Sequence, residues 1–221
     1  MLGYLTIVTA ILSAAIWFGI VWRPASRALT ESASTRATKI APATAIALTV
    51  LVSILLTIRS QPAATTISLI VVGTWSTGAM TQTVVDASTR RLPLRISHLT
   101  ALMLAAATIL DAPSRTVSIA AGAVAMTAIT LALTRLTRGS LGRGDVHFSP
   151  MLGVMIGWSS PWPDLLSALI MMWLITTVTA ALVTLGGLAL RRLDRGSTIP
   201  YGPFMALGTL VVVASALGAT P

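Results

Sequence analysis

Uncharged, mostly apolar stretches alternate with short polar segments along the whole chain. Eight stretches contain no Asp, Glu, Lys or Arg: residues 1–22, 40–58, 60–85, 96–110, 116–134, 146–163, 165–190 and 196–221. A helix that crosses a bilayer needs about 17–25 predominantly apolar residues. The pattern therefore predicts an all-α polytopic membrane protein with about eight transmembrane helices, which we interpret as a single membrane-embedded domain over residues 1–221.

Two of the eight stretches fit a spanning helix less well than the others. Residues 96–110 are short for this purpose, and residues 146–163 contain three prolines. Because proline interrupts the hydrogen bonding of a helix, we expect the second stretch to hold a part-depth helix that begins near Met151 and ends near Trp158.

The basic residues are concentrated in alternate loops between the apolar stretches. The loops 23–39, 86–95, 135–145 and 191–195 hold 13 of the 15 Lys and Arg residues, and the other loops hold only Arg59 and Arg115. Cytoplasmic loops of membrane proteins carry an excess of Lys and Arg. This distribution predicts an N-out, C-out topology, with the net charge of +9 on the cytoplasmic side.

The composition agrees with a membrane protein and excludes several kinds of site. The chain is 55% hydrophobic and 10% charged, whereas soluble domains carry about 25% charged residues. It has no cysteine, which excludes disulfides, cysteine zinc ligands and a cysteine nucleophile. With two histidines we expect no metal site. Nucleic acid is not an expected partner, because the basic residues are divided among short loops with few aromatic residues between them.

Two of the six acidic residues stand out by their positions. Asp86 and Asp145 each lie at the predicted inner end of an apolar stretch. Two carboxyl groups on one side of the membrane can share a proton, so that one activates water and the other protonates a substrate carbonyl. The alternative is that Asp86 offsets Arg90 and Arg91 while Asp145 caps the helix after it, and position alone favours this alternative. We interpret the remaining acids as turn, cap, loop or counter-ion residues: Glu31, Asp111, Asp164 and Asp194.

The residues around Asp145 favour a catalytic role. Gly142-Arg143-Gly144-Asp145 places the carboxyl group on a glycine-containing loop that enters an apolar helix. Gly142 and Gly144 allow tight backbone turns and the close approach of a peptide. By itself so short a glycine motif has little specificity.

Three separated segments together resemble the type IV prepilin peptidases, a family of GxGD membrane aspartyl peptidases. They are Asp86-Ala87-Ser88-Thr89-Arg90-Arg91-Leu92-Pro93, Gly142-Arg143-Gly144-Asp145-Val146-His147, and Ile199-Pro200-Tyr201-Gly202-Pro203-Phe204-Met205-Ala206-Leu207-Gly208. The order of the segments, the number of spans and the inner position of both aspartates are also similar to the family.

The resemblance implies an aspartic endopeptidase in the cell membrane, with Asp86 and Asp145 as the catalytic pair facing the cytoplasm. Its substrate would be a prepilin or pilin-like protein of a type IV pilus or secretion system, cut after a Gly at the inner membrane boundary. No cofactor is implied. Gly142 and Gly144 would shape the catalytic loop. Other residues would lie near the site: His147, Arg90, Arg91, Pro200, Gly202 and Pro203.

The chain departs from the family at several points. His147 stands where the family often has Lys, and Leu94 stands where Asn or Asp often follows the proline. Many bacterial members also methylate the new N-terminus and carry a long cytoplasmic insertion after the first helix. Here the corresponding loop is only 23–39, so we predict a peptidase without methyltransferase activity that needs no S-adenosylmethionine.

Two interpretations from other classes stay open. Inward-facing carboxylates can bind protons or cations, which would suit a small proton- or cation-coupled transporter. A non-catalytic pilus or secretion assembly factor could keep the same fold. No acid falls in the middle of an apolar stretch, no half-helix repeat is evident, and both aspartates are present, so the peptidase is favoured.

Overall fold

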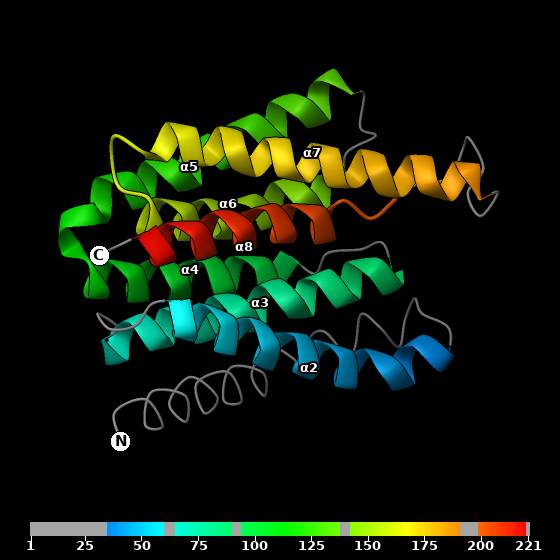
Figure 1. Ribbon diagram of the computed structural model, residues 1–221, viewed down its shortest axis with the longest axis horizontal. Helices are drawn as coiled ribbons and strands as arrows, with labels where there is room; N and C mark the ends of the chain where they lie inside the picture. The colour runs from blue at the N-terminus through cyan, green and yellow to red at the C-terminus, as the bar shows by residue number, and fades with distance from the viewer. Residues whose placement is uncertain (1–34, 60–64, 90–93, 138–141, 191–198, 220–221) are drawn as a thin grey trace.

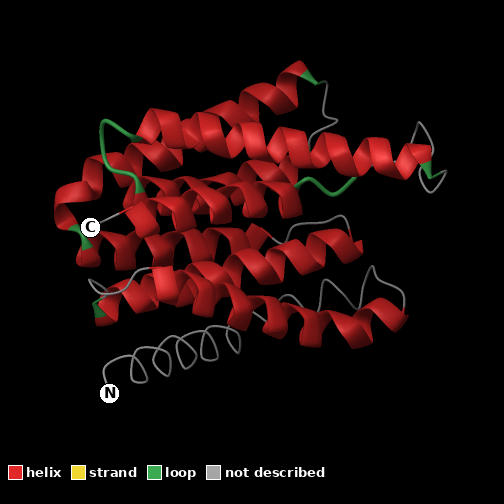
Figure 2. Cartoon of the chain, viewed as in Figure 1, coloured by secondary structure: helices red, strands yellow, loops and turns green. Residues whose placement is uncertain are grey.

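The computed structural model describes residues 35–59, 65–89, 94–137, 142–190 and 199–219, and these residues form seven α-helices and one short 3-10 turn. The helices lie side by side along the long axis of the molecule (Figure 1), and the described residues contain helices and loops without a strand (Figure 2). In chain order they are α2 (Thr35–Arg59), α3 (Thr66–Thr89), α4 (Leu94–Asp111), η1 (Pro113–Arg115), α5 (Thr116–Leu136), α6 (Arg143–Ser159), α7 (Leu165–Ala189) and α8 (Gly202–Ala219).

Within the described residues, each apolar stretch corresponds to one of these helices. Seven stretches each coincide with a helix, and the first, residues 1–22, lies outside the described residues. The all-α prediction is confirmed for the part of the chain that the structure describes. Within that part, three segments are long and apolar enough to cross a membrane: Leu94–Asp111, Pro113–Leu136 and Leu165–Ala189. Eight spans and the N-out orientation stay predictions.

The helices divide into an inner and an outer group. α5 and α7 each bury one stripe of residues and expose large apolar side chains, such as Val124 and Leu166. An apolar outer face of this kind suits contact with lipid. α3 and α6 are instead buried on most of their surface, α3 despite its many Ser and Thr residues. These two inner helices carry Asp86 and Asp145.

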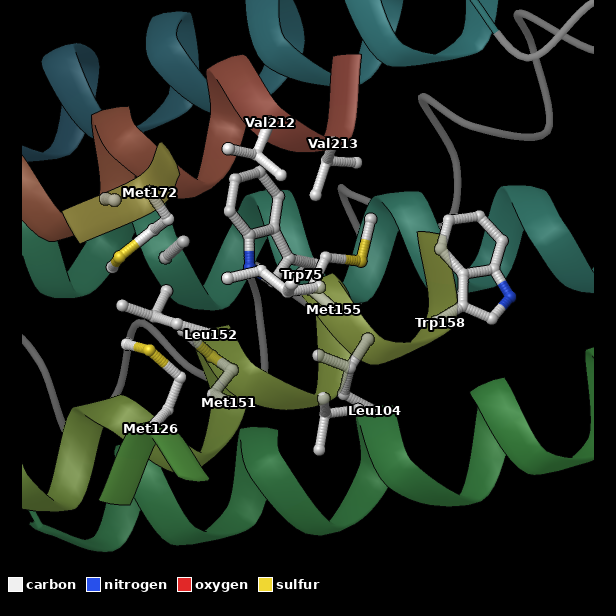
Figure 3. Close-up of a cluster of buried hydrophobic side chains, with 14 of the residues drawn as sticks. Trp75, Leu104, Met126, Met151, Leu152, Met155, Trp158, Met172, Val212 and Val213 are labelled. Atoms are coloured by element: carbon white, nitrogen blue, oxygen red, sulfur yellow. The ribbon is translucent and has the colours of Figure 1, made fainter. Parts of the chain in front are cut away.

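The core lies between α3, α6 and α8. The indole of Trp75 on α3 lies near Val212 and Val213 of α8 and Met155 of α6, and all four side chains are buried (Figure 3). Methionines supply much of the remaining core, and their flexible side chains fill irregular gaps between the helices. The core therefore holds α8 against both inner helices.

Small residues allow α5 and α6 to pack closely. A methyl group on Gly153 of α6 would collide with the carbonyl oxygen of Gly122 on α5, and one on Gly157 would collide with that of Ser118. Small residues four positions apart on each helix are the usual means of close backbone approach in membrane helices. This contact fixes α6, and with it Asp145, against the outer helix.

The start of α6 differs from our expectation. The helix begins at Arg143, not near Met151, and it ends at Ser159, close to the expected end. Pro150 lies inside the helix and cannot donate to the carbonyl oxygen of Val146. The hydroxyl of Ser149 donates to that oxygen instead, at 2.9 Å. The side chain thus replaces the missing backbone bond, and the helix continues through the proline.

Asp111 links three helices at one end of the bundle. Its carboxylate accepts hydrogen bonds from Thr65 Oγ1 at 2.6 Å, Ser68 Oγ at 2.9 Å and Trp158 Nε1 at 2.9 Å. It therefore joins the start of α3, the end of α4 and the end of α6, a wider role than the turn or cap that we expected. Asp86 and Asp145 lie toward the opposite ends of α3 and α6.

Candidate active site

Asp86 lies in the last turn of α3 and contacts the start of α8. Its carboxylate oxygen Oδ2 accepts a hydrogen bond from the backbone N–H of Gly202 at 3.1 Å, and the side chain is 5% exposed. The first N–H groups of a helix have no partner within the helix, so a carboxylate is favourable there. A Cβ atom at position 202 would lie 2.8 Å from Oδ2. The contact therefore requires glycine.

Asp145 lies in the first turn of α6 and is equally buried, at 5% exposed. Its Oδ2 accepts a hydrogen bond from the backbone N–H of Gly142 at 3.1 Å, and its own N–H donates to the carbonyl oxygen of Gly142 at 3.1 Å. The carboxylate of Asp145 therefore caps α6, as predicted by the non-catalytic interpretation of this residue. Capping does not require burial, so the low exposure needs a further reason.

Asp86 and Asp145 lie just outside the uncharged stretches 60–85 and 146–163. The pKa of each carboxyl group is raised from its ordinary value. Burial raises the pKa of Asp86 to about 6, and the hydrogen bond from Gly202 lowers it in part. Burial also raises the pKa of Asp145 to about 7, with a further increase from the negative charge of Asp86 and a decrease from the hydrogen bond of Gly142. Near neutral pH the two groups can hold one proton between them.

Tyr201 lies near Asp145, a position that the sequence analysis did not single out. It precedes Gly202, and its ring stacks on Trp173 of α7 at a centroid distance of 6.5 Å. The phenol forms a hydrogen bond with Thr177 and lies within electrostatic range of Asp145. The motif around Tyr201 was recognised, but its contact with α7 depends on packing that the sequence does not display.

The prolines around Tyr201 lie close to the site because they flank Gly202. Pro200 comes just before α8, and Pro203 is its second residue. Proline fixes its own φ angle and suits the first turn of a helix, where its missing N–H costs nothing. The pair therefore restricts the backbone that presents the Gly202 N–H to Asp86. Arg90 and Arg91 lie outside the described residues.

His147 contacts a residue that the sequence analysis did not identify. Its Nδ1 lies 3.1 Å from Nε2 of His98 on α4, and the two rings meet edge to face. These are the two histidines of the chain. Within the described ranges, no group of three or more His, Cys, Asp or Glu side chains is arranged to hold a metal ion.

The arrangement has the chemistry of an acid and base pair. Two buried carboxyl groups with raised pKa values, held by backbone N–H groups, can share a proton and activate a water molecule between them. Gly142 and Gly202 each bind one oxygen of a carboxyl group. The second oxygen of each group is then the one suited to water or substrate.

Comparison with known proteins identifies the segment that carries both aspartates. A sequence model of the Type IV leader peptidase family matches residues 76–186, just over half of the chain. The matched range includes Asp86, the Gly142–Asp145 loop and His147. No curated protein and no solved structure matches the chain.

Proposed function

The chain belongs to the Type IV leader peptidase family, and from this premise we propose that it is an aspartic endopeptidase that removes the N-terminal leader of prepilins or pilin-like proteins. The observation that supports the proposal best is the pairing of two buried carboxyl groups, Asp86 and Asp145, at one end of the helix bundle. Buried carboxyl groups are costly to maintain and are kept mainly where they do chemistry.

The reaction requires one proton on the pair. The charged carboxylate removes a proton from water, and the hydroxide attacks the carbonyl carbon of the scissile bond while the protonated carboxyl group donates to its oxygen. The C–N bond of the resulting tetrahedral intermediate then breaks, and the amine leaves with a proton from the pair. We assign the base and acid roles to the pair together, because interacting groups titrate jointly.

The site is placed at the cytoplasmic face of the cell membrane in this proposal. The concentration of basic residues in the loops next to Asp86 and Asp145 supports this orientation. About eight helices in one domain would span the bilayer, N-out and C-out. The apolar helix of the substrate would stay in the bilayer while its leader, cut after a Gly, reaches the two aspartates. Neither a cofactor nor S-adenosylmethionine takes part.

The test is leader removal in membranes that contain the enzyme and a leader-bearing pilin. Asp86→Asn and Asp145→Asn should each lower the cleavage rate by about 10³-fold or more, since neither leaves a pair that can exchange a proton. Asp164→Asn is the matched control, because Asp164 is exposed and its side chain makes no capping hydrogen bond. Wild-type rates in both site variants would contradict the proposal. Ion or solute flux that depends on Asp86 and Asp145, without cleavage, would support the transporter instead.

A further inference from the structure

The two helices that carry the aspartates are held apart by other helices. The backbones of α3 and α6 make little direct contact, whereas α4 and α8 each pack against both of them. The distance between Asp86 and Asp145 is therefore set by the helices between α3 and α6. α8 contributes through the hydrogen bond from Gly202 to Asp86.

Ser97 of α4 forms a hydrogen bond with Gln82, which lies about one turn before Asp86 on α3. Its hydroxyl donates to Gln82 Oε1 at 2.5 Å, and both side chains are fully buried. The amide nitrogen of Gln82 also lies 3.8 Å from the sulfur of Met151 on α6. A buried amide that loses its partner is unfavourable, so the Ser97 contact fixes α4 at this level of α3.

His98, the next residue of α4, contacts α6 two residues after Asp145. Its Nε2 lies 3.1 Å from Nδ1 of His147, and one ring donates to the other. Two adjacent residues of one helix thus contact both of the helices that carry the aspartates. The contacted side chains belong to Gln82 and His147, which are close in sequence to Asp86 and Asp145.

We propose that Ser97 and His98 are positioning residues that set the spacing of Asp86 and Asp145. They act through Gln82 and His147 and do not touch the substrate. The proposal rests on the peptidase function proposed above. Its physical basis is that catalytic groups must hold a fixed geometry, and a displacement of about 1 Å can cost roughly 10²-fold in rate.

The first test separates positioning from general stability. Ser97→Ala and His98→Ala should each lower kcat by roughly ten-fold and leave KM within about two-fold. His98→Gln keeps a donor and an acceptor and should retain most of the rate. Leu102→Ala is the control, because Leu102 is an exposed residue of α4. Unchanged kcat in both alanine variants would overturn the proposal.

The pH profile gives a readout that a purely structural residue would not change. The charge of Asp86 helps to raise the pKa of Asp145. If the carboxyl groups move apart, this contribution weakens, and the alkaline limb of the cleavage profile should shift to lower pH. An unshifted profile in variants with reduced kcat would contradict a change of spacing.

The second test measures the spacing without using catalysis. The chain has no cysteine, so spin labels can be placed at Ala87→Cys and Arg143→Cys, two exposed positions near Asp86 and Asp145. The distance distribution should shift or broaden in Ser97→Ala and His98→Ala but not in Leu102→Ala, and an unchanged distribution would overturn the proposal. If the distance shifts in these variants but the wild-type protein cuts no pilin, the positioning role of Ser97 and His98 is kept and the peptidase function is rejected.

A second variant keeps the test usable if Ser97→Ala alone does not fold. Replacing both partners of a buried hydrogen bond by apolar groups avoids the cost of an orphaned amide. Ser97→Ala combined with Gln82→Leu should therefore fold and still show the altered distance and the reduced kcat. A wild-type distance and rate in this double variant would overturn the role of Ser97.

Discussion

Gly202 donates its backbone N–H to the carboxylate of Asp86 at 3.1 Å, which joins two residues that are 116 positions apart in the chain. The start of α8 thereby becomes part of the candidate site that α3 and α6 form. A Cβ atom at position 202 would lie 2.8 Å from the bonded oxygen. This contact gives a physical role to the glycine that lies between two prolines in the third segment of the resemblance, a segment outside the matched range 76–186.

Gly202→Ala should impair cleavage more than it impairs folding. The added methyl group would push against Asp86, displace its carboxyl group and weaken the bond from the N–H, so we expect the rate to fall by about 10–100-fold. Gly186→Ala is the matched control, because a Cβ atom there would meet nothing within 4 Å. Cleavage of a leader-bearing pilin by the purified variants measures the difference. Equal rates in the two variants would show that the contact has no catalytic importance.

The cleavage rate should pass through a maximum between about pH 6 and 7. Burial raises the pKa of Asp86 to about 6 and that of Asp145 to about 7. Below this range both groups are protonated and no base is present, and above it both are charged and no acid is present. Initial rates from pH 4 to 9 test the prediction. A rate that stays constant from pH 5 to 8 would reject a shared proton.

The same carboxyl groups should make the folded protein less stable as the pH rises. Their pKa values in the folded state, about 6 and about 7, lie above the ordinary pKa of an aspartate side chain. Their stabilising contribution is therefore complete below about pH 4 and is lost as the pH rises through 6 and 7. Asp145→Asn removes the charge while an amide oxygen can still cap α6. Its thermal midpoint should exceed that of the wild type at pH 8 by a few degrees and match it at pH 4, and a lower midpoint at pH 8 would contradict the burial argument.

The positions of the helices and the choice of Asp86 and Asp145 as candidate site residues both follow from the distribution of charge along the sequence. Charges are excluded from apolar helices, so the uncharged stretches locate the helices, and a carboxyl group next to such a stretch is noticeable. The start of α6 was predicted wrongly, because the sequence pattern does not show that Ser149 replaces the bond lost at Pro150. The contacts of Ser97 with Gln82 and of His98 with His147 depend on the packing of separate helices, and no spacing in the chain reveals them.

Asp111 should be important for stability and unimportant for the chemistry. Asp111→Ala removes the acceptor that Thr65, Ser68 and Trp158 share. The buried indole N–H of Trp158 then loses its acceptor, at a cost of about 1–3 kcal/mol, whereas Thr65 is exposed and its hydroxyl can still pair with that of Ser68. The thermal midpoint should therefore fall by several degrees, and by less in Ser68→Ala, which removes a single donor. Cleavage per folded enzyme should stay within about two-fold of the wild type, because Asp111 lies at the end of the bundle away from Asp86 and Asp145. A large loss of kcat with an unchanged thermal midpoint would mean that the two ends of the bundle are coupled through α3 or α6.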